Sequence, residues 1–392
     1  MIAPQPFFEP RGTPFSEYHR IRTLISLGHT VDLVTYPFGQ DVSIAGLRVF
    51  RCARPPFLNS VRIGPSLAKV PLDVLLAFEA IRRALQNSYD VVHSHEEGVV
   101  VGVLLAKLMK VPHLYDMHSS LPQQFSNFGF SRSKILDGIF GLIEKTAIRW
   151  SRVVIVICPY LKEVVRVIDA DATIVLIENA PGAGDSSLPE VPGDSVRSKL
   201  GLPDESVLVL YTGTFEAYQG LDLLLASVRL VIKEETNTKF VLVGGRTDQV
   251  AMVKKQAQEA GVEGAMVFTG QLSSKEIPSF LDAADALVSP RSTGWNTPLK
   301  IYQYLRSGKP IVATRLLTHT QVLNDDVAVL TGATPEEYAE GLIRVIRDPS
   351  YGREVGKRAK DLAETKYTYE AYLNRTRMSY AALFEDVSGL DQ

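Results

Sequence analysis

A lysine stands in the first turn of a helix predicted within Thr297–Thr314, TPLKIYQYLRSGKPIVAT. Thr297 suits the N-cap of this helix, a proline suits its first position, and Gly308 suits its end, before the apolar strand IVA. A helix N-terminus favours anions, so Lys300 at this place indicates that an anion binds here. Gln303 lies on the same face of the helix. We therefore predict a phosphate on the helix N-terminus beside Lys300, with sugar hydroxyls bound by Gln303.

Two further cations follow predicted strands in the C-terminal half. Arg246 comes directly after FVLVGG, and Arg291 comes directly after ALVSP. Because the carboxyl ends of parallel strands meet at one edge of a sheet, we expect both arginines and Lys300 on one rim. Arginine, lysine and backbone amides together suit a diphosphate group.

Histidines and acids gather at the ends of two predicted strands in the N-terminal half. DVVHSHEEG ends in His93, His95, Glu96 and Glu97, and HLYDMHSS ends in Asp116 and His118. This set favours hydroxyl binding or acid–base chemistry on a polar substrate. Zinc is disfavoured, because H-x-H without a cysteine or a clear third ligand is a poor zinc pattern. His93 equally suits a hydrogen bond inside the sheet end, and His118 is the stronger site candidate.

Two shorter motifs carry less information. RGTP follows the first predicted strand, and Gly12 supplies backbone freedom before a helix, which is a weak sign of an anion or hydroxyl site. No G-x-G-x-x-G follows it, so the dinucleotide-binding fingerprint is absent. The D-x-D of Asp169–Asp171 lies between a helix and a strand and is predicted to form a turn.

Short apolar runs and helical patterns alternate along the whole chain and must position these side chains. The predicted helices of the first half are Ser16–Leu27, Leu67–Leu85, Gly98–Lys110 and Lys134–Trp150, between the strands MIAPQ, VDLVTY, LRVFRC, DVVHSH, HLYDMH, RVVIVIC and TIVLIEN. After a segment rich in Pro, Gly, Ser and acids, the alternation restarts with SVLVLYTG, FVLVGG, AMVFTG, ALVSP, PIVAT and VAVL. This pattern predicts an α/β protein of two doubly wound, Rossmann-like domains that face a cleft.

The same alternation suggests domain bounds. We assign residues 1–178 to an N-terminal domain, 179–195 to a linker and 196–368 to a C-terminal domain. Residues 369–392 are predicted to form a terminal helix that packs back on the N-terminal domain.

The composition restricts the partners and the compartment. The 392 residues are 45% hydrophobic and 22% charged, with a formal net charge of −2, which is typical of a globular protein and too weakly basic for nucleic-acid binding. Two cysteines in apolar contexts favour a reducing compartment. We expect neither a signal peptide nor a membrane span, and hence a cytoplasmic protein. Lys134–Arg152 most simply packs on its own sheet, but its basic and apolar residues also suit peripheral contact with the inner face of the cell membrane.

These motifs together resemble the GT-B glycosyltransferases of family 4. The resemblance covers essentially the whole chain and rests on RGTP, the DMH strand end, YTGTFEAYQG and NTPLKIYQYLRSGKPIVAT. It implies a retaining, metal-independent enzyme without a cofactor that moves a sugar from a UDP- or GDP-sugar to a hydroxyl acceptor. That acceptor is a glycan, a lipid-linked molecule or a small molecule. The resemblance implies that the C-terminal domain holds the donor and the N-terminal domain holds the acceptor.

Roles for single residues follow from the strand ends and this resemblance together. His118, Lys300 and Arg291 are the predicted catalytic residues, with His118 beside the transferred sugar and the two cations beside the diphosphate. The predicted donor-binding residues are Gly12, Gly213, Thr214, Gln219, Arg246, Gly270, Leu272, Thr297 and Gln303. The predicted acceptor-binding residues are Thr13, Glu96, Glu97 and Asp116. No residue is assigned to a metal.

The chain departs from the family pattern at four positions. The two acids of the family fall at Trp295 and Gln303. Its Arg and Lys pair falls at Thr214 and Gln219. The amide of Gln303 can still hydrogen-bond hydroxyls, and we expect the three strand-end cations of the C-terminal half to supply the missing positive charge.

Two alternative functions stay open. A nucleotide-sugar epimerase of the GT-B fold would need a carboxylate base, and Glu96 or Glu97 could supply it. A non-catalytic GT-B scaffold that binds sugars or nucleotides would show similar losses of family residues. Consumption of a nucleotide-sugar that requires an acceptor would distinguish the transferase from the epimerase.

Overall fold

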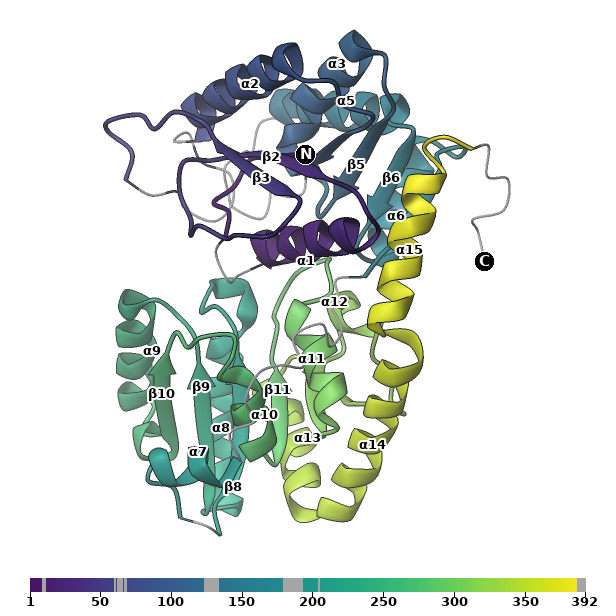
Figure 1. The fold of residues 1–392 in the computed structure, drawn as a ribbon. Helices are drawn as coiled ribbons and strands as arrows, with labels where there is room; N and C mark the ends of the chain where they lie inside the picture. The colour runs from purple at the N-terminus through teal and green to yellow at the C-terminus, as the bar shows by residue number, and fades with distance from the viewer. Residues whose placement is uncertain are drawn as a thin grey trace. The chain divides into compact units, whose positions relative to one another are not determined.

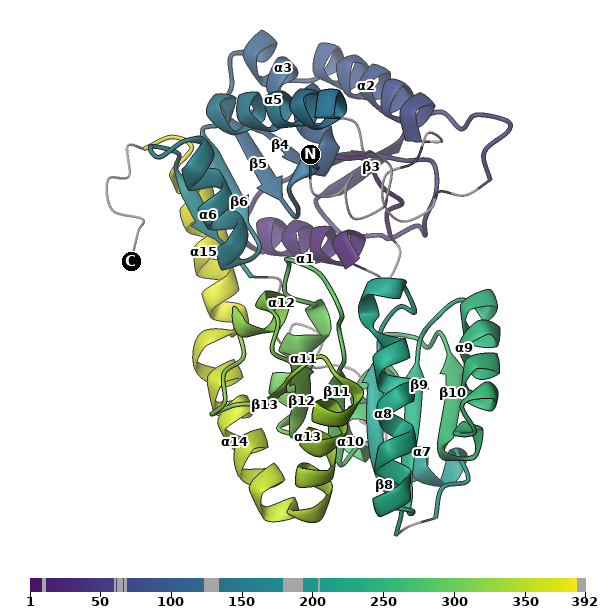
Figure 2. The ribbon, with the colours of Figure 1, turned by 180° about the vertical axis from the view of Figure 1, so that it is seen from behind.

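The computed structural model describes residues 1–8, 12–59, 61, 66, 69–122, 134–178, 193–203 and 205–385. The chain forms two units, each with a central sheet and covering helices (Figures 1 and 2). The N-terminal unit consists of Met1–Pro181 and Glu370–Gln392, and the C-terminal unit consists of Gly182–Tyr369. The predicted linker 179–195 lies outside the described residues, except for the three that begin helix α7.

A seven-stranded parallel sheet forms the centre of the N-terminal unit, in the order β3-β2-β1-β4-β5-β6-β7. The strands are β1 (Ile2–Ala3), β2 (Val31–Thr35), β3 (Leu47–Arg51), β4 (Val92–His95), β5 (His113–Met117), β6 (Val153–Val156) and β7 (Ile174–Leu176). Most are short apolar runs, because helices cover both faces of the sheet. The winding direction reverses between β1 and β4, and the carboxyl ends of these two strands form the switch point where ligands bind in such sheets.

Helices of the N-terminal unit pack on both faces of this sheet. They are α1 (Gly12–Ser26), α2 (Lys69–Gln86), η1 (Glu96–Gly98), α3 (Val99–Met109), α5 (Lys134–Trp150), α6 (Pro159–Ile168) and α15 (Tyr369–Ala381). Helices α2, α3, α5 and α6 share apolar clusters with Tyr36, Tyr115 and Val154 on one face. Helix α1 clusters with Leu33 on the other face, and α15 clusters there with Leu114. The last helix is therefore part of the core of the N-terminal unit.

A six-stranded parallel sheet forms the centre of the C-terminal unit, in the order β10-β9-β8-β11-β12-β13. The strands are β8 (Val207–Thr212), β9 (Thr238–Val243), β10 (Met266–Gly270), β11 (Ala286–Ser289), β12 (Ile311–Thr314) and β13 (Val329–Thr331). The helices are α7 (Gly193–Lys199), η2 (Ala217–Gln219), α8 (Leu221–Glu234), α9 (Thr247–Glu259), η3 (Glu263–Ala265), α10 (Ile277–Ala283), α11 (Leu299–Ser307), α12 (Leu317–Thr320), α13 (Pro335–Arg347) and α14 (Pro349–Lys366). The switch point of this sheet lies between β8 and β11.

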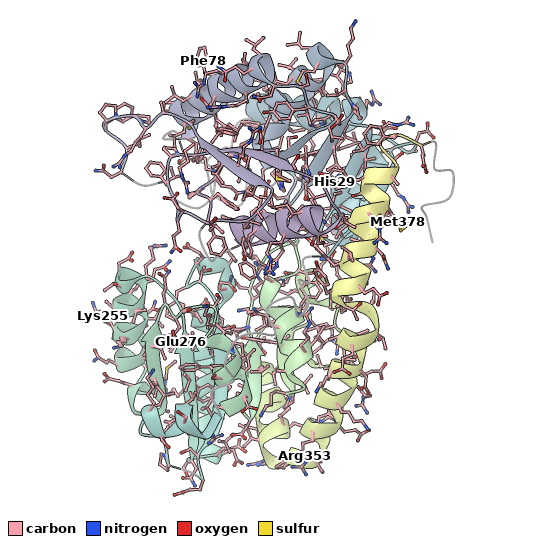
Figure 3. All side chains as sticks on the ribbon, in the orientation of Figure 1. His29, Phe78, Lys255, Glu276, Arg353 and Met378 are labelled. Carbon is pink, nitrogen blue, oxygen red and sulfur yellow. The ribbon has the colours of Figure 1, made fainter. Side chains whose placement is uncertain are left out.

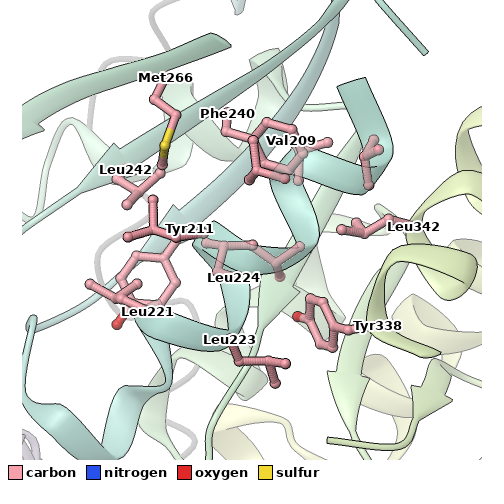
Figure 4. Close-up of a cluster of buried hydrophobic side chains, with 14 of the residues drawn as sticks. Val209, Tyr211, Leu221, Leu223, Leu224, Phe240, Leu242, Met266, Tyr338 and Leu342 are labelled. Carbon is pink, nitrogen blue, oxygen red and sulfur yellow. The ribbon is translucent and has the colours of Figure 1, made fainter. Parts of the chain in front are cut away.

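One apolar cluster joins α8 and α13 to the C-terminal sheet (Figure 4). Leu224 of α8 and Leu342 of α13 are fully buried against Phe240 of β9 and its neighbours. The hydroxyl of Tyr338 donates to the carbonyl oxygen of Val312 over 3.0 Å, so this polar group inside the cluster is satisfied. The cluster holds the strand ends in a fixed arrangement.

The predicted fold class is confirmed, and helix α5 has the predicted bounds. Helix α1 begins at Gly12, earlier than the predicted Ser16. Pro14 therefore lies in its first turn. Proline is tolerated there because the N–H groups of a first turn have no partner inside the helix. Within the described residues, no helix is long and apolar enough to cross a membrane.

The start of helix α11 differs from the prediction by one residue. The N-cap is Pro298, whose carbonyl oxygen accepts the N–H of Ile301 over 3.0 Å, so Thr297 does not cap the helix. The predicted end is confirmed: Gly308 follows α11 with a φ of 70°, a left-handed conformation that glycine adopts without strain.

Candidate functional site

Lys300 is a buried cation at the carboxyl end of the C-terminal sheet. It lies in the first turn of α11, and only 8% of it is exposed. Its Nζ lies 3.3 Å from Gln219 Oε1 and 3.9 Å from the centre of the Tyr211 ring. Burial lowers the pKa of Lys300 well below its ordinary value, and the positive charge of Arg291 lowers it further. No carboxylate of the described residues forms an ion pair with Lys300.

Arg291, two residues after β11, is a second, partly buried cation at this place. Its Nη1 donates to the carbonyl oxygen of Asn296 over 2.8 Å and to Thr318 Oγ1 over 2.7 Å. Its guanidinium carbon lies 5.0 Å from the centre of the Tyr218 ring, and its Nε is buried without a hydrogen-bond partner. Burial lowers the pKa of Arg291. Among the described residues, no acid forms an ion pair with Lys300 or Arg291, so an anion bound beside them would be favoured.

Two glycines keep the space beside this pair free of side chains. Gly213 follows β8 with a φ of 140°, and a Cβ there would lie 3.4 Å from Lys300 Nζ. Gly244 follows β9 with a φ of 122°, and a Cβ there would collide with the carbonyl oxygen of Gly213. The backbone N–H groups of both glycines donate within the sheet, to Val243 and to Gly270. These two glycines thus provide room for a ligand, while their own N–H groups are already used.

Arg246 does not share the environment of Lys300 and Arg291. Its half-exposed guanidinium donates to Glu216 Oε1 over 3.0 Å and to Asp248 Oδ1 over 3.2 Å. Glu216 also accepts from Gln249, and the resulting network fixes the start of α9. Of the three predicted cations, Lys300 and Arg291 lie together without an acidic partner among the described residues, and Arg246 is a compensated surface arginine.

The remaining predicted donor residues differ in their positions and surroundings. Gln219 Nε2 donates to Thr214 Oγ1 over 3.4 Å, which joins these two positions. Thr297 is buried, and its Oγ1 has no hydrogen-bond partner. Gln303 is exposed on α11. Gly270 ends β10 with a φ of 72°, and Leu272, two residues later, is half-buried. In the N-terminal unit, the predicted donor residue Gly12 is the first residue of α1, and the predicted acceptor residue Thr13 is the second.

An ion pair lies at the centre of the predicted N-terminal site. Arg20 of α1 donates from Nε to Asp116 Oδ2 over 3.1 Å, and both side chains are almost completely buried. Arg20 Nη1 also donates to Thr376 Oγ1 of α15 over 2.9 Å. Burial alone would raise the pKa of Asp116, but Arg20 and His118 hold it well below its ordinary value. Asp116 is therefore ionised and paired with Arg20 through Oδ2.

Three histidines surround Asp116, and the two predicted strand ends do come together here. His118 Nε2 lies 3.3 Å from Asp116 Oδ1 and 3.4 Å from His95 Nδ1, and the hydroxyl of Tyr380 lies 2.8 Å from His93 Nδ1. Burial lowers the pKa of His93 to about 4 and that of His95 well below its ordinary value. His93 and His95 are therefore neutral at pH 7, and His93 makes the hydrogen bond at the sheet end that its position suggested.

Glu96 and Glu97 follow directly after β4 and differ in their surroundings. Glu96 has a φ of 46°, a left-handed conformation that is uncommon for a residue with a side chain and is often associated with functional sites. Ser119 Oγ donates to Glu96 Oε2 over 2.9 Å, and burial raises the pKa of Glu96 to about 7. Glu97 pairs with Lys69 over 2.8 Å. Glu96 is thus a carboxyl group able to gain or lose a proton near neutral pH.

Several residues of this network were not among the predicted site residues. They are Gln5, Glu17, Arg20, Thr376 and Tyr380. Gln5 donates to Glu17, a fully buried carboxyl group whose pKa burial raises well above its ordinary value. A charged pair on one face of α1, Glu17 and Arg20 three residues apart, was the available signal. No local pattern marks the two α15 residues.

The histidine cluster contains three side chains that could be metal ligands. His93, His95 and Asp116 offer ligand atoms that lie within 4.8 Å of one another. A metal ion here would lie beside the guanidinium of Arg20, which already occupies one oxygen of Asp116. Because a buried cation strongly disfavours a second one nearby, this cluster fits a hydrogen-bonded network better than a metal site.

A cavity of about 410 Å³ opens at the amino ends of β5, β6 and β7. Lys107, His113, Trp150 and Asp171 are among the residues that line it. The predicted turn at Asp169–Asp171 lies here, and the Asp171 N–H donates to Asp169 Oδ1 over 3.2 Å. This cavity is at the edge of the sheet opposite the switch point, and it contains none of the predicted site residues.

The sequence matches two family models. Residues 18–180 match the model described as Glycosyltransferase Family 4, and residues 194–362 match the model described as Glycosyl transferases group 1. The alpha-monoglucosyldiacylglycerol synthase of Streptococcus pneumoniae is 25% identical over 250 residues, which are 60% of this chain and 54% of that protein. The chain thus matches about half the length of this relative.

Solved structures of the same architecture cover nearly the whole chain. The sucrose-phosphate synthase of Thermosynechococcus elongatus matches with a TM-score of 0.79 and 19% identity, over 98% of this chain and 99% of that chain. HepE of Anabaena, solved in complex with UDP-glucose, matches with a TM-score of 0.71 and 17% identity, over 97% of this chain and 99% of that chain. At these identities the likeness establishes the fold, which is GT-B. The two family models together cover most of the chain, and the chain belongs to the glycosyl transferases of group 1 and family 4.

Proposed function

We propose that the chain transfers a sugar from a UDP- or GDP-sugar to a hydroxyl acceptor, with retention of the anomeric configuration and without a metal ion. Membership of the family supports a transfer reaction. The relative from Streptococcus pneumoniae is named as the synthase of a glucosylated diacylglycerol, and HepE was solved with UDP-glucose. These names support a nucleotide-sugar donor, and they include a lipid among the acceptors to be tried.

The Lys300–Arg291 pair is the observation that carries this proposal. Both cations lie at the switch point of the C-terminal sheet without an acidic partner among the described residues. A diphosphate at this place would accept hydrogen bonds from both and remove the repulsion between them.

The position of Lys300 also suggests how the family's lysine was replaced. That lysine falls on Gln219 in this chain, and Lys300 Nζ lies 3.3 Å from Gln219 Oε1. A positive charge that the family supplies from the loop after β8 is here supplied from α11. This relocation supports a retained donor site and argues against the non-catalytic scaffold.

The proposed chemistry needs no protein nucleophile. The bond between the anomeric carbon and the diphosphate oxygen breaks, and Lys300 and Arg291 stabilise the negative charge that develops on the leaving diphosphate. The acceptor oxygen bonds to the anomeric carbon from the same face, and its proton passes to an oxygen of the leaving phosphate. Because two protein cations neutralise this charge, a metal ion is not required. His118 would orient the transferred sugar, and Glu96 would hold the acceptor hydroxyl.

Donor binding without a metal tests the proposal directly. The chain is titrated with UDP, GDP and their common sugars, with EDTA or with magnesium, while its melting temperature is recorded. One nucleotide class should stabilise the chain equally in both conditions, by about 2.7 kcal/mol at a hundred times its Kd. NMR of the product then reports the anomeric configuration. Stabilisation that requires magnesium, an inverted product, or consumption of donor at the same rate without an acceptor would contradict the proposal.

The raised pKa of Glu96 predicts a pH dependence. Above about pH 7 Glu96 is ionised, so kcat/KM for the acceptor should rise as the pH passes through this value. The folded state holds the Glu96 proton more tightly than the unfolded state does, so this group lowers the stability as pH rises from about 4.5 to 7. Glu96→Gln should flatten the rate profile and remove this part of the stability loss.

Rate profiles of the wild type and of two variants check this prediction. Glu163→Gln, at an exposed position on α6 of the same unit, is the matched control and should keep the wild-type profile. If Glu96→Gln keeps the same midpoint near pH 7, another group controls the profile and Glu96 does not act on the acceptor.

A further inference from the structure

Exposed apolar side chains gather on three helices of the N-terminal unit. They are Val70, Val74, Phe78, Ile81 and Leu85 on α2, Val100, Leu104 and Leu108 on α3, and Ile139, Leu142 and Trp150 on α5. Exposure is large for several of them: 66% for Phe78, 78% for Leu108 and 83% for Leu85. Elsewhere in the described residues such side chains are scattered, which is normal for a soluble surface. A concentration of this kind marks an interaction surface.

These side chains form one continuous surface, here called the apolar face. On α2 and α3 they recur every three or four residues, which places them along a single stripe of each helix. Helix α3 packs against both α2 and α5, and the three helices lie in one layer over the same side of the sheet (Figures 1 and 2). The opposite stripes, with Leu76 and Val103, are buried in the core. The exposed apolar stripes of α2 and α3 are therefore not needed for packing in the core.

The charged residues of the apolar face have a single sign. Among the described side chains of the three helices, every exposed charged residue is basic: Arg82, Lys107, Lys145 and Arg149. Lys110 and Arg152 lie just beyond the ends of α3 and α5 and are exposed as well. The ammonium group of Lys107 lies over the ring of Trp150, at the edge of the face.

The acids of these helices whose side chains are described are partly or fully buried and have partners. Asp73 accepts from the hydroxyl of Tyr36, and Glu144 is buried and accepts from the N–H of Leu121 over 2.7 Å. Glu79 is mostly buried and accepts from Arg83 over 2.7 Å and from Arg82. The surface offered to a partner is therefore apolar and positively charged.

The exposed apolar side chains and the basic residues around them together favour one binding partner for the apolar face. A second copy packed about a two-fold axis would place the basic residues of one chain against those of the other, which is unfavourable. An anionic lipid surface accepts the apolar side chains below the headgroups and attracts the surrounding lysines and arginines. Trp150 beside Lys107 suits the headgroup level, where aromatic rings with one polar end are favoured.

We propose that the apolar face docks the N-terminal unit onto an anionic lipid bilayer. The helices α2, α3 and α5 lie along the surface, with Phe78, Leu104 and Leu108 inserted and the lysines and arginines at the phosphates. The proposal extends the basic character of Lys134–Arg152 to a surface of three helices. It does not depend on the transfer reaction, because docking requires neither donor nor acceptor.

Vesicle flotation with the full chain tests the proposal. Wild type should bind vesicles of equal parts phosphatidylglycerol and phosphatidylcholine, bind phosphatidylcholine alone weakly, and lose affinity as salt is raised. Phe78→Glu with Leu104→Glu places two acids on the face at exposed positions and should weaken binding at least about tenfold. Met252→Glu, at an exposed apolar position on α9, is the matched control and should bind like wild type. Circular dichroism verifies that each variant is folded.

Three results would overturn the proposal. They are a wild type that ignores anionic vesicles, a double variant that binds them as tightly as wild type, and a control that loses binding equally. Sedimentation of the chain without lipid tests the competing occupant. If the wild type sediments as a dimer and the double variant as a monomer, the apolar face is assigned to a second copy of the chain.

Discussion

The Lys300→Met variant is expected to melt at a higher temperature than the wild type and to bind nucleoside diphosphates far more weakly. Lys300 is buried with no acidic partner among the described residues, and replacing such a charge by an apolar side chain of similar length stabilises a fold. The same change removes one of the two cations proposed to meet the diphosphate. A charge-assisted hydrogen bond of about 1.5–3 kcal/mol corresponds to roughly a tenfold to hundredfold loss of affinity.

The opposite signs of the two effects separate a functional role from a structural one. A variant that merely misfolded would lose stability and binding together. Lys255→Met on α9, where the side chain is exposed (Figure 3), is the matched control and should change neither quantity. The measurements are the melting temperature without ligand and the Kd for UDP and GDP by calorimetry. Unchanged affinity in Lys300→Met would remove Lys300 from the proposed site, and the donor proposal would lose its main support.

The Asp116→Asn variant is expected to lose about 3–5 kcal/mol of stability, because it leaves the buried Arg20 without its counter-ion. Both side chains are almost fully buried, so solvent does not weaken their interaction. Urea denaturation followed by circular dichroism measures the loss. The double variant Arg20→Met with Asp116→Leu removes both charges and should recover most of the stability.

Two comparisons sharpen this prediction. Asp325→Asn breaks the surface pair with Arg315 and should cost no more than about 1 kcal/mol, because both groups are exposed. A loss of similar size for Asp116→Asn would show that another group compensates Arg20. Glu17 is the nearby candidate, since the charge of Asp116 helps to keep its pKa raised. Adding Glu17→Gln to Asp116→Asn would then uncover the full loss.

The architecture followed from local patterns in the sequence. Apolar runs of four to six residues alternating with helical periods predicted two doubly wound parallel sheets, and the bounds of α5 were predicted to the residue. Such patterns are reliable because each short strand must be apolar to be covered on both faces. The helix start at α11 was displaced by one residue, since Thr297 was predicted as the N-cap and Pro298 as the first helical residue, and the backbone makes Pro298 the N-cap.

The sequence predicted the donor residues, but it did not show their electrostatic surroundings. Lys300, Arg291 and Arg246 all follow strand ends, and nothing in the sequence distinguishes them. Tertiary packing places Glu216, 30 residues away, against Arg246 and leaves the other two cations without an acid in the described residues. The contact of Lys300 with Gln219 joins residues 81 positions apart. Charge compensation depends on which chain segments meet in space, so it was not visible in the sequence.

The N-terminal site shows the same division. The types and spacing of the residues by themselves determined that His93, His95, Asp116 and His118 would converge, because adjacent parallel strands end at one edge. Tertiary structure alone decided what surrounds them. Arg20 reaches Asp116 across 96 positions, and Thr376 of the last helix reaches Arg20 across 356. Arg20 and His118 hold Asp116 ionised, and burial keeps His93 and His95 neutral, because a pKa depends on the packed environment and not on the order of residues along the chain.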